Sequence, residues 1–334
     1  MSLQVLSALA LLVGSAALIY FSSELFVNGV EWLGRKLNVS RTAVGSVLAA
    51  FGTALPESVV TLVAVLGGHN DAEKDIGVGA ALGGPLVLGT VTYAVVGLAI
   101  LACGARQGST ALRFDPKQLS RDQIWFLLIF VVKIALGLVA FSFKPLLGFA
   151  FIAAYAVYFW MELRREGDQG EHEELEPLTF RRKAADPSLG WVLAQTGVAV
   201  VITYLASHLF VQQIGLIGPW VGLSPAVVAL LLSPVATELP ETLNALIWIR
   251  QGKQGLAVAN ISGAMMIQAT IPSAFGLMFT RWMFDAPLVL SGLITLASVA
   301  TILLLLYRRT LTALRLSWFW AFYVAFAVGL VFLH

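Results

Sequence analysis

Two short segments, far apart in the chain but alike in sequence, each place a carboxylate directly after a proline. The first reads Gly-Thr-Ala-Leu-Pro-Glu and ends at Glu57, and the second reads Ala-Thr-Glu-Leu-Pro-Glu and ends at Glu241. Each also carries a threonine hydroxyl four residues before that glutamate, at Thr53 and Thr237. Hard cations such as Ca²⁺ and Na⁺ bind oxygen ligands of this kind, whereas zinc and copper favour nitrogen and sulfur. The two segments therefore predict a site for a hard cation.

Both segments lie in a strongly apolar chain. Of its 334 residues, 58% are hydrophobic and 12% are charged, and the mean hydropathy is +0.85. This composition excludes a soluble protein. A carboxylate inside an apolar span is unfavourable to bury, so its first interpretation is functional. Each proline removes a backbone donor, so both spans are expected to kink or unwind near the membrane midplane and to present free carbonyl oxygens there.

Ten apolar stretches are long enough to cross a bilayer, which takes about 20 residues each. They lie at residues 4–33, 41–66, 75–104, 123–142, 145–163, 188–214, 224–249, 255–280, 286–307 and 312–333. The first has no basic start of the kind that precedes a cleaved signal peptide, so it is interpreted as a membrane helix. The expected fold is an all-α polytopic membrane protein whose second and seventh helices are broken at the midplane.

The basic residues are distributed very unevenly among the loops. Loops after odd-numbered stretches hold seventeen Lys and Arg residues, whereas loops after even-numbered stretches hold three. The positive-inside rule therefore places both chain ends outside the cytoplasm, in a multi-pass protein of the cell membrane. The net charge of +2 is too small to indicate a nucleic acid partner. The expected partners are small inorganic cations and the lipid bilayer.

The chain contains an internal duplication. At an offset of 184 residues, thirteen of the 38 positions from Tyr20 to Glu57 are identical in the second copy. Each copy spans five helices, an odd number, so the two copies must enter the membrane in opposite directions, as in inverted-repeat transporters. The predicted organisation is a first five-helix repeat at 1–163, a hydrophilic cytosolic linker at 164–187 and a second, inverted repeat at 188–334.

The stretches that follow the two segments supply small and polar residues. The third stretch contains Gly83-Gly84-Pro85, which permits close helix approach. The eighth contains Asn260, Ser262 and Gln268, whose side chains are neutral oxygen donors within a span. Gln268 is the strongest candidate ligand of the three, and hydrogen bonding between helices is the alternative for all of them.

The paired segments in a five-plus-five helix chain resemble the two α-repeats of the cation/calcium antiporter superfamily, on the side of the prokaryotic sodium/calcium exchangers. The resemblance covers nearly the whole chain. It implies secondary antiport of Ca²⁺ for Na⁺ by alternating access, with no cofactor and no enzymatic activity. It also implies a ligand set of the carboxylates Glu57 and Glu241, the hydroxyls of Thr53 and Thr237, and the backbone carbonyls of Ala50 and Pro234. No nucleotide-binding motif or nucleophile constellation accompanies them.

Three departures from the family pattern concern the driving ion. Sodium-coupled members place an amide or carboxylate where this chain has Leu88 and Gln268, and a small hydroxyl residue where it has Glu238. Glu238 would bring a third carboxylate to the site, and three such charges repel one another in a cavity of low dielectric. At least one is therefore expected to hold a proton until a cation displaces it. A proton-coupled exchanger of Ca²⁺ or another divalent cation is the first alternative function, and a cation channel or Ca²⁺-binding sensor is the second.

Three further polar residues have open roles. Glu24 and His208 are repeat equivalents on the first and sixth stretches, where a gate or proton relay competes with packing or water contact near a helix end. Lys133 lies inside the fourth stretch and could snorkel, pair with a carboxylate or line a contact between subunits. The sequence does not decide among these roles, nor does it give the oligomeric state.

Overall fold

The computed structural model describes residues 3–37, 49–107, 110–163 and 175–333, and all regular secondary structure in these ranges is helical. Eight helices within them are long and apolar enough to cross a membrane. The chain is therefore an all-helical, multi-pass membrane protein, as the sequence predicts, and eight of the ten expected spans meet these criteria in the described residues.

The helices follow the apolar stretches of the sequence closely. They are α1 (Leu3–Lys36), α3 (Ala49–Gly67), α4 (Asp71–Val87), the π-helical turn η2 (Leu88–Thr92), α5 (Tyr93–Gln107), α6 (Pro116–Gly137), the 3₁₀ turn η3 (Lys144–Leu146), α7 (Leu147–Leu163), the 3₁₀ turn η4 (Thr179–Arg181), α8 (Leu189–Val221), α9 (Pro225–Thr237), α10 (Leu239–Arg250), α11 (Gln254–Phe279), α12 (Ala286–Tyr307), α13 (Ala313–Ser317) and α14 (Trp320–Leu333).

Several helices begin at a capping residue that the sequence places beside a proline. Asp115 accepts a hydrogen bond from the Lys117 N–H at the start of α6, and Ser224 accepts one from the Val227 N–H at the start of α9. In both helices the next residue is proline, whose missing N–H is not needed in the first turn. Cap and proline together fix where these helices start.

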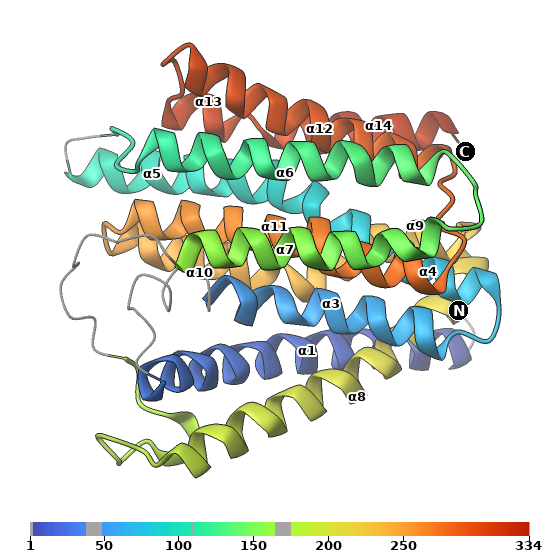
Figure 1. Cartoon of the computed structure of the whole chain (residues 1–334), viewed down its shortest axis with the longest axis horizontal. Helices are drawn as coiled ribbons and strands as arrows, with labels where there is room; N and C mark the ends of the chain where they lie inside the picture. Colours follow the sequence, from blue (N-terminus) through green and yellow to red (C-terminus); the bar gives the residue numbers. More distant parts are fainter. Residues whose placement is uncertain (1–2, 38–48, 108–109, 164–174, 334) are drawn as a thin grey trace.

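The helices pack in layers with α11 in the middle (Figure 1). The long helices α1 and α8 lie side by side along one side of the bundle, and both contact α3. On the opposite side, α12 packs on α6 and α14. Between them, α11 contacts α3, α4, α6 and α7. Helix α1 begins and α14 ends at one edge of the bundle, whereas α5 and α7 end at the other edge.

The closest helix approach in the centre joins α4 to α9, one helix from each half of the sequence. A Cβ atom at Gly79 would overlap the carbonyl group of Ala226, and one at Gly83 would lie 2.5 Å from the carbonyl oxygen of Leu230. Only glycine permits this separation. The small residues of the third stretch therefore allow the close approach that the sequence predicts, and they bring α4 against the helix that carries Thr237.

The seventh stretch is broken at the expected place. Helix α9 ends at Thr237, Glu238 forms the joint with φ −99° and ψ −7°, and α10 begins at Leu239. Two prolines flank this joint, Pro234 inside α9 and Pro240 in the first turn of α10. Each removes one backbone donor, so two successive turns lose a hydrogen bond and the helix is interrupted.

The expected break in the second stretch is not present within the described part of the chain. Helix α3 runs without interruption from Ala49 to Gly67 with Pro56 inside it. The expectation of a broken second helix is therefore wrong for these residues. The physical reason is that Pro56 is the one proline in α3, and a single missing donor leaves the hydrogen bonds of the neighbouring turns in place.

Candidate cation site

Thr237 links the two repeated segments. It is the last residue of α9 and is fully buried. Its hydroxyl oxygen Oγ1 lies 2.8 Å from Glu57 Oε2 on α3 and 2.8 Å from Glu238 Oε1 at the joint. The same oxygen lies 3.2 Å from the carbonyl oxygen of Ser233. Residues that are 180 positions apart in the sequence thus share one hydroxyl group.

Gln268 and Gly84 complete this cluster from α11 and α4. The Gln268 amide Nε2 donates a hydrogen bond to Glu238 Oε2 at 2.8 Å. A Cβ atom at Gly84 would lie 2.7 Å from Gln268 Oε1 and 3.0 Å from Glu238 Oε1. Helix α4 therefore presents bare backbone to the two side chains. The structure brings Glu57, Thr237, Glu238 and Gln268 together, and all four are buried.

Hydrogen counting at Thr237 constrains the charge of the cluster. A hydroxyl group has one hydrogen to donate, so at most one of the two neighbouring carboxylates accepts from Thr237. The second carboxyl oxygen must either donate its own proton to the hydroxyl or share a cation with it. An ionised carboxylate left without such a partner in this buried place would be strongly destabilising. The geometry of Glu57 and Glu238 therefore suits a proton or a cation between them.

Glu241 is fully buried in the first turn of α10, one turn beyond Glu238. The N-terminus of a helix carries a partial positive charge, which favours a carboxylate there. Within the described residues, no three His, Cys, Asp or Glu side chains are grouped closely enough to hold a metal ion by themselves. A cation in this region would accordingly need hydroxyl, amide or carbonyl oxygens in addition to the carboxylates.

The remaining expected ligands have mixed outcomes. Ala50 and Thr53 belong to α3, but their side chains lie outside what the structure describes. The Pro234 carbonyl accepts the Glu238 N–H at 2.8 Å and keeps one lone pair for another partner. Their roles as ligands stay predictions.

Two polar residues of α11 differ from Gln268. Ser262 lies 3.2 Å from the Gln123 amide, which donates to it, and 3.4 Å from the Tyr93 hydroxyl. Its contacts therefore fit hydrogen bonding between helices. Asn260 is buried, and neither its amide nitrogen nor its oxygen has a hydrogen-bond partner in the described residues. Leu88, at the start of the π-helical turn, is fully buried and has no ligand atom.

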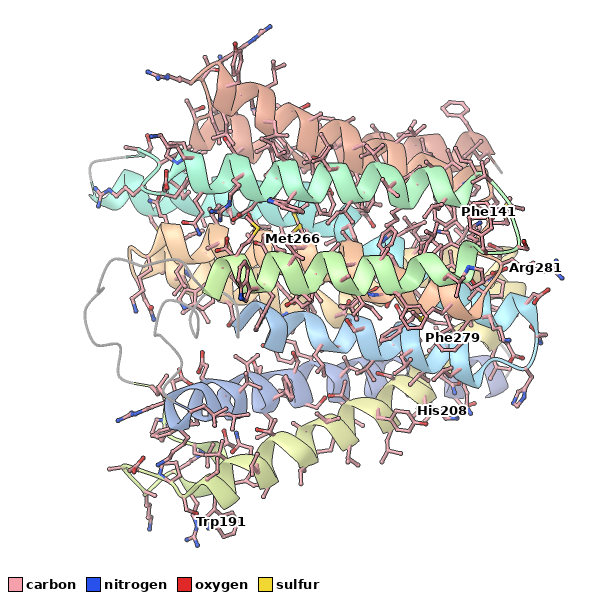
Figure 2. All side chains as sticks on the ribbon, in the orientation of Figure 1. Phe141, Trp191, His208, Met266, Phe279 and Arg281 are labelled. Carbon is pink, nitrogen blue, oxygen red and sulfur yellow. The ribbon has the colours of Figure 1, made fainter. Side chains whose placement is uncertain are left out.

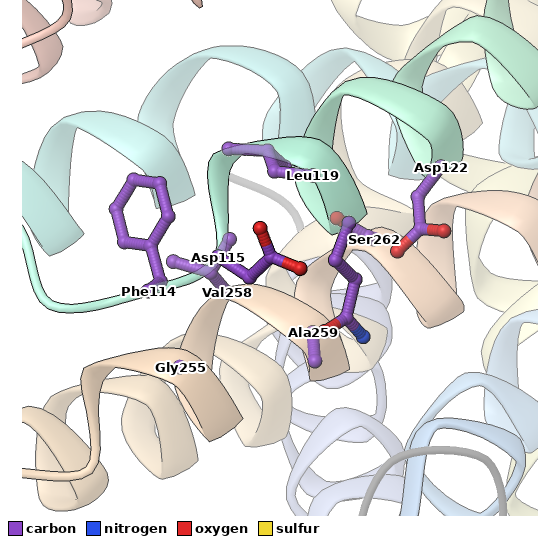
Figure 3. A pocket seen from close by; sticks show the side chains of 9 residues that line it. Phe114, Asp115, Leu119, Asp122, Gly255, Val258, Ala259 and Ser262 are labelled. Carbon is purple, nitrogen blue, oxygen red and sulfur yellow. The ribbon is translucent and has the colours of Figure 1, made fainter. Parts of the chain in front are cut away.

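A small cavity lies near the start of α6 and of α11 (Figure 3). Its volume is about 70 Å³, and its polar lining comes from Asp115, Gln118, Asp122 and Ser262. Arg121 forms an ion pair with Asp122 at 3.0 Å and another with Glu162. Asp122 and Glu162 therefore share Arg121 as their counter-ion.

Glu24 on α1 is exposed. His208 on α8 is also exposed (Figure 2). The Tyr20 hydroxyl donates to Glu24 at 2.5 Å, and His208 Nε2 lies 3.1 Å from the Gln212 amide. Each side chain therefore has a hydrogen-bond partner on its own helix. This arrangement fits contact with water on a helix surface.

The sequence left the role of Lys133 open, and the structure shows which groups it contacts. It is fully buried, and its ammonium Nζ donates to the carbonyl oxygens of Ala81 at 2.6 Å and of Gln268 at 3.4 Å. Gln268 thus contacts Lys133 through its backbone and Glu238 through its side chain. The charge of a lysine inside a span signals function, but its partners follow only from the fold.

Comparison with known proteins identifies the family. The sodium/calcium exchanger protein family matches residues 7–164 and 191–333. The chain is 25% identical over 311 residues to the inner membrane protein YrbG of Escherichia coli (strain K12), covering 91% of this chain and 90% of that protein. Its fold is similar to that of the H⁺/Ca²⁺ exchanger CAX, with a TM-score of 0.76 and 18% identity over 97% of this chain and 82% of the other. It is also similar to the sodium-calcium exchanger NCX_Mj, with a TM-score of 0.62 and 21% identity over 98% and 99% of the two chains. Because the family match covers most of the sequence, the chain belongs to the sodium/calcium exchanger protein family and is a membrane transporter rather than an enzyme.

Proposed function

We propose that this chain exchanges Ca²⁺ for a monovalent cation by alternating access, with Glu57, Glu238 and Glu241 as its charged ligands. The observation that carries the proposal is the buried cluster around Thr237, which joins α3 to the broken α9–α10 segment. Carboxylate, hydroxyl and amide oxygens are the ligands that Ca²⁺ accepts in an irregular shell. Thr53, Gln268 and the carbonyls of Ala50 and Pro234 complete the proposed ligand set.

The geometry favours H⁺ over Na⁺ as the counter-ion. Sodium is the expectation from the family resemblance, but Leu88 is fully buried and offers no ligand atom. The oxygen of Thr237 lies at equal distances from two carboxylates, which suits one protonated and one ionised carboxyl group. In this scheme Ca²⁺ displaces the proton on one side of the membrane, and a proton displaces Ca²⁺ on the other. A high proton concentration on the side where Ca²⁺ binds should therefore slow its uptake.

The proposed architecture is a pair of inverted five-helix repeats at 1–163 and 188–334, joined by a cytosolic linker at 164–187. The start of α1 and the end of α14 at one edge of the bundle support an even number of crossings. With the basic loops in the cytosol, both chain ends lie outside it. A cysteine introduced at Gln169 should label from the cytosol and one at His334 from outside. Labelling of both from the same side would refute this topology.

Transport into proteoliposomes tests the function directly. We expect an outward-directed H⁺ gradient, with the lumen acidic, to drive uptake of ⁴⁵Ca²⁺, and an equal Na⁺ gradient without a pH difference to drive little. Uptake driven by Na⁺ alone would establish the sodium-coupled exchanger instead. Ca²⁺ flux that needs neither gradient would indicate a channel, and Ca²⁺ binding without flux a sensor.

A further inference from the structure

The ammonium group of Lys133 is held inside the protein rather than at the lipid surface. Its Nζ contacts the carbonyl oxygens of Ala81 on α4 and Gln268 on α11, and it lies 5.1 Å from the ring centre of Phe130 and 6.0 Å from that of Trp282. The Trp282 indole N–H in turn donates to the backbone carbonyl of Lys133. These contacts exclude snorkelling to the membrane surface.

The two carbonyls that Lys133 contacts are made available by prolines. In an α-helix the carbonyl of a residue accepts the N–H four positions later. For Ala81 that position is Pro85 inside α4, and for Gln268 it is Pro272 inside α11. Neither proline has an N–H, so neither carbonyl has its helical partner. Two helices thus present one free carbonyl each to the same point.

That point has the properties of a site for a monovalent cation. Backbone carbonyls released from helical hydrogen bonding are the groups that transporters use to coordinate Na⁺ at membrane depth. The aromatic rings of Phe130 and Trp282 add negative electrostatic potential from the sides. Among the described residues, Glu57 on α3 interacts electrostatically with Lys133, and Gln268 bonds to Lys133 through its carbonyl and to Glu238 through its side chain.

We propose that Lys133 is a tethered cation that permanently fills this carbonyl site and so determines ion specificity. Its positive charge takes the place of one transported monovalent ion beside Glu57 and Glu238. Na⁺ is thereby kept out of this position. One fewer monovalent ion is then exchanged per Ca²⁺ than in the same site without the lysine. The inference rests on the proposed function only in assuming that cations bind at the neighbouring carboxylates.

Thermal unfolding of the purified full-length protein tests this without any transport. Wild type, Lys133→Ser and Lys133→Gln are compared in Na⁺ and in choline at equal ionic strength and without Ca²⁺. A ligand that binds the folded state raises the unfolding temperature. We expect no difference between the salts for wild type and a rise of about 2–4 °C in saturating Na⁺ for Lys133→Ser. Lys133→Gln keeps an N–H donor for one carbonyl, so it serves if the serine variant does not fold.

Lys144 provides the matched control. Its Nζ donates to the carbonyl oxygens of Val139 and Trp282, both at 2.7 Å, and the residue is also buried. It belongs to the turn before α7, and in the described residues its hydrogen bonds go to backbone carbonyls and to Met283 rather than to a carboxylate. Lys144→Ser should lower the unfolding temperature equally in both salts, because a buried lysine is lost without a neighbouring anion to attract Na⁺.

A second substitution checks where the gained Na⁺ binds. Pro85→Ala restores an N–H that can take the Ala81 carbonyl back into α4, so adding it to Lys133→Ser should remove most of the stabilisation by Na⁺. The proposal is overturned if the folded Lys133 variants gain no more stabilisation from Na⁺ than wild type does, or if Lys144→Ser gains as much as Lys133→Ser. A wild type that fails to exchange Ca²⁺ would refute the proposed function and would leave this measurement intact.

Discussion

The two proline-glutamate segments share a sequence pattern but differ in structure. In the first copy, α3 is one helix through Pro56, whereas in the second copy the helix stops at Thr237 and restarts at Leu239. At the offset of 184 residues, Ala50 corresponds to Pro234 and Ala54 to Glu238. The second copy therefore has one more proline and one more carboxylate. The comparison indicates that the shared motif supplies the proposed ligands, and that these two differences account for the break and the extra carboxylate.

The joint in the second copy also orients Glu238. Its N–H is bonded to the Pro234 carbonyl, and its own carbonyl accepts both the N–H of Thr242 at 3.1 Å and the Thr242 hydroxyl at 2.9 Å. The backbone of the joint is thus fixed on both sides. Its carboxylate is then held between Thr237 and Gln268, so the added charge has a defined position.

The largest effect is expected where the two copies are alike. Glu57→Gln and Glu241→Gln should each lower Ca²⁺ exchange by about 100-fold or more, because either change removes a full charge from a site that must dehydrate a dication. The measurement is ⁴⁵Ca²⁺ exchange in proteoliposomes, with the unfolding temperature as the control for folding. Near-normal exchange by either variant would show that the copies do not contribute equally.

The fold could be predicted from the sequence because each of its signals is local. Hydropathy predicted ten spans, and eight of them are helices long and apolar enough to cross a membrane in the described residues. The repeated motif predicted that Glu57 and Thr237 lie close together, which the structure confirms. The continuity of α3 and the partners of Lys133 could not be predicted in the same way. The first depends on how many donors one helix loses, and the second on whether Pro85 and Pro272 release carbonyls toward the same lysine. That coincidence exists only once α4, α6 and α11 are packed together.

Glu238 is the carboxylate that the second copy has and the first copy lacks. If Glu238 carries the exchanged proton, Glu238→Gln should flatten the dependence of Ca²⁺ exchange on pH, because an amide resembles the protonated acid and does not titrate. If it replaces a sodium ligand, the same variant should lose its response to Na⁺ instead.

Glu238→Ser completes that test, because it shortens the side chain and also removes its charge. Exchange is measured against pH and against Na⁺ for wild type and both variants. If the dependence of exchange on pH and on Na⁺ is unchanged in both variants, Glu238 does not take part in coupling. The extra carboxylate of the second copy then has a role other than ion coupling.

A smaller effect is expected at the glycine that faces the second copy. In Gly84→Ala, the new methyl group displaces the flexible end of Gln268 and breaks its hydrogen bond to Glu238. Loss of one hydrogen bond to a charged group corresponds to about a tenfold fall in exchange. Gly89→Ala is the control, since its Cβ would meet its nearest neighbours at 3.7–3.9 Å, an ordinary contact distance. Equal losses in both variants would show that helix packing, and not the Gln268 contact, is responsible.

The smallest effects on exchange are expected from replacing Pro234 in the second copy and Pro56 in the first. Pro234→Ala returns an N–H to α9 and leaves Pro240 as the one proline at the joint, which resembles the single proline of the continuous α3. We expect the joint to become more helical and exchange to fall about fivefold, because a regular turn draws the Glu238 backbone away from its present position. Pro56→Ala adds a donor to a helix that is already continuous, so exchange should change by less than about twofold. Hydrogen exchange of the backbone around Glu238 gives a second readout, with protection expected to rise only in Pro234→Ala. Equal effects of the two substitutions would mean that the break is set by the Leu-Pro-Glu motif common to both copies, and that the continuity of α3 needs a different explanation.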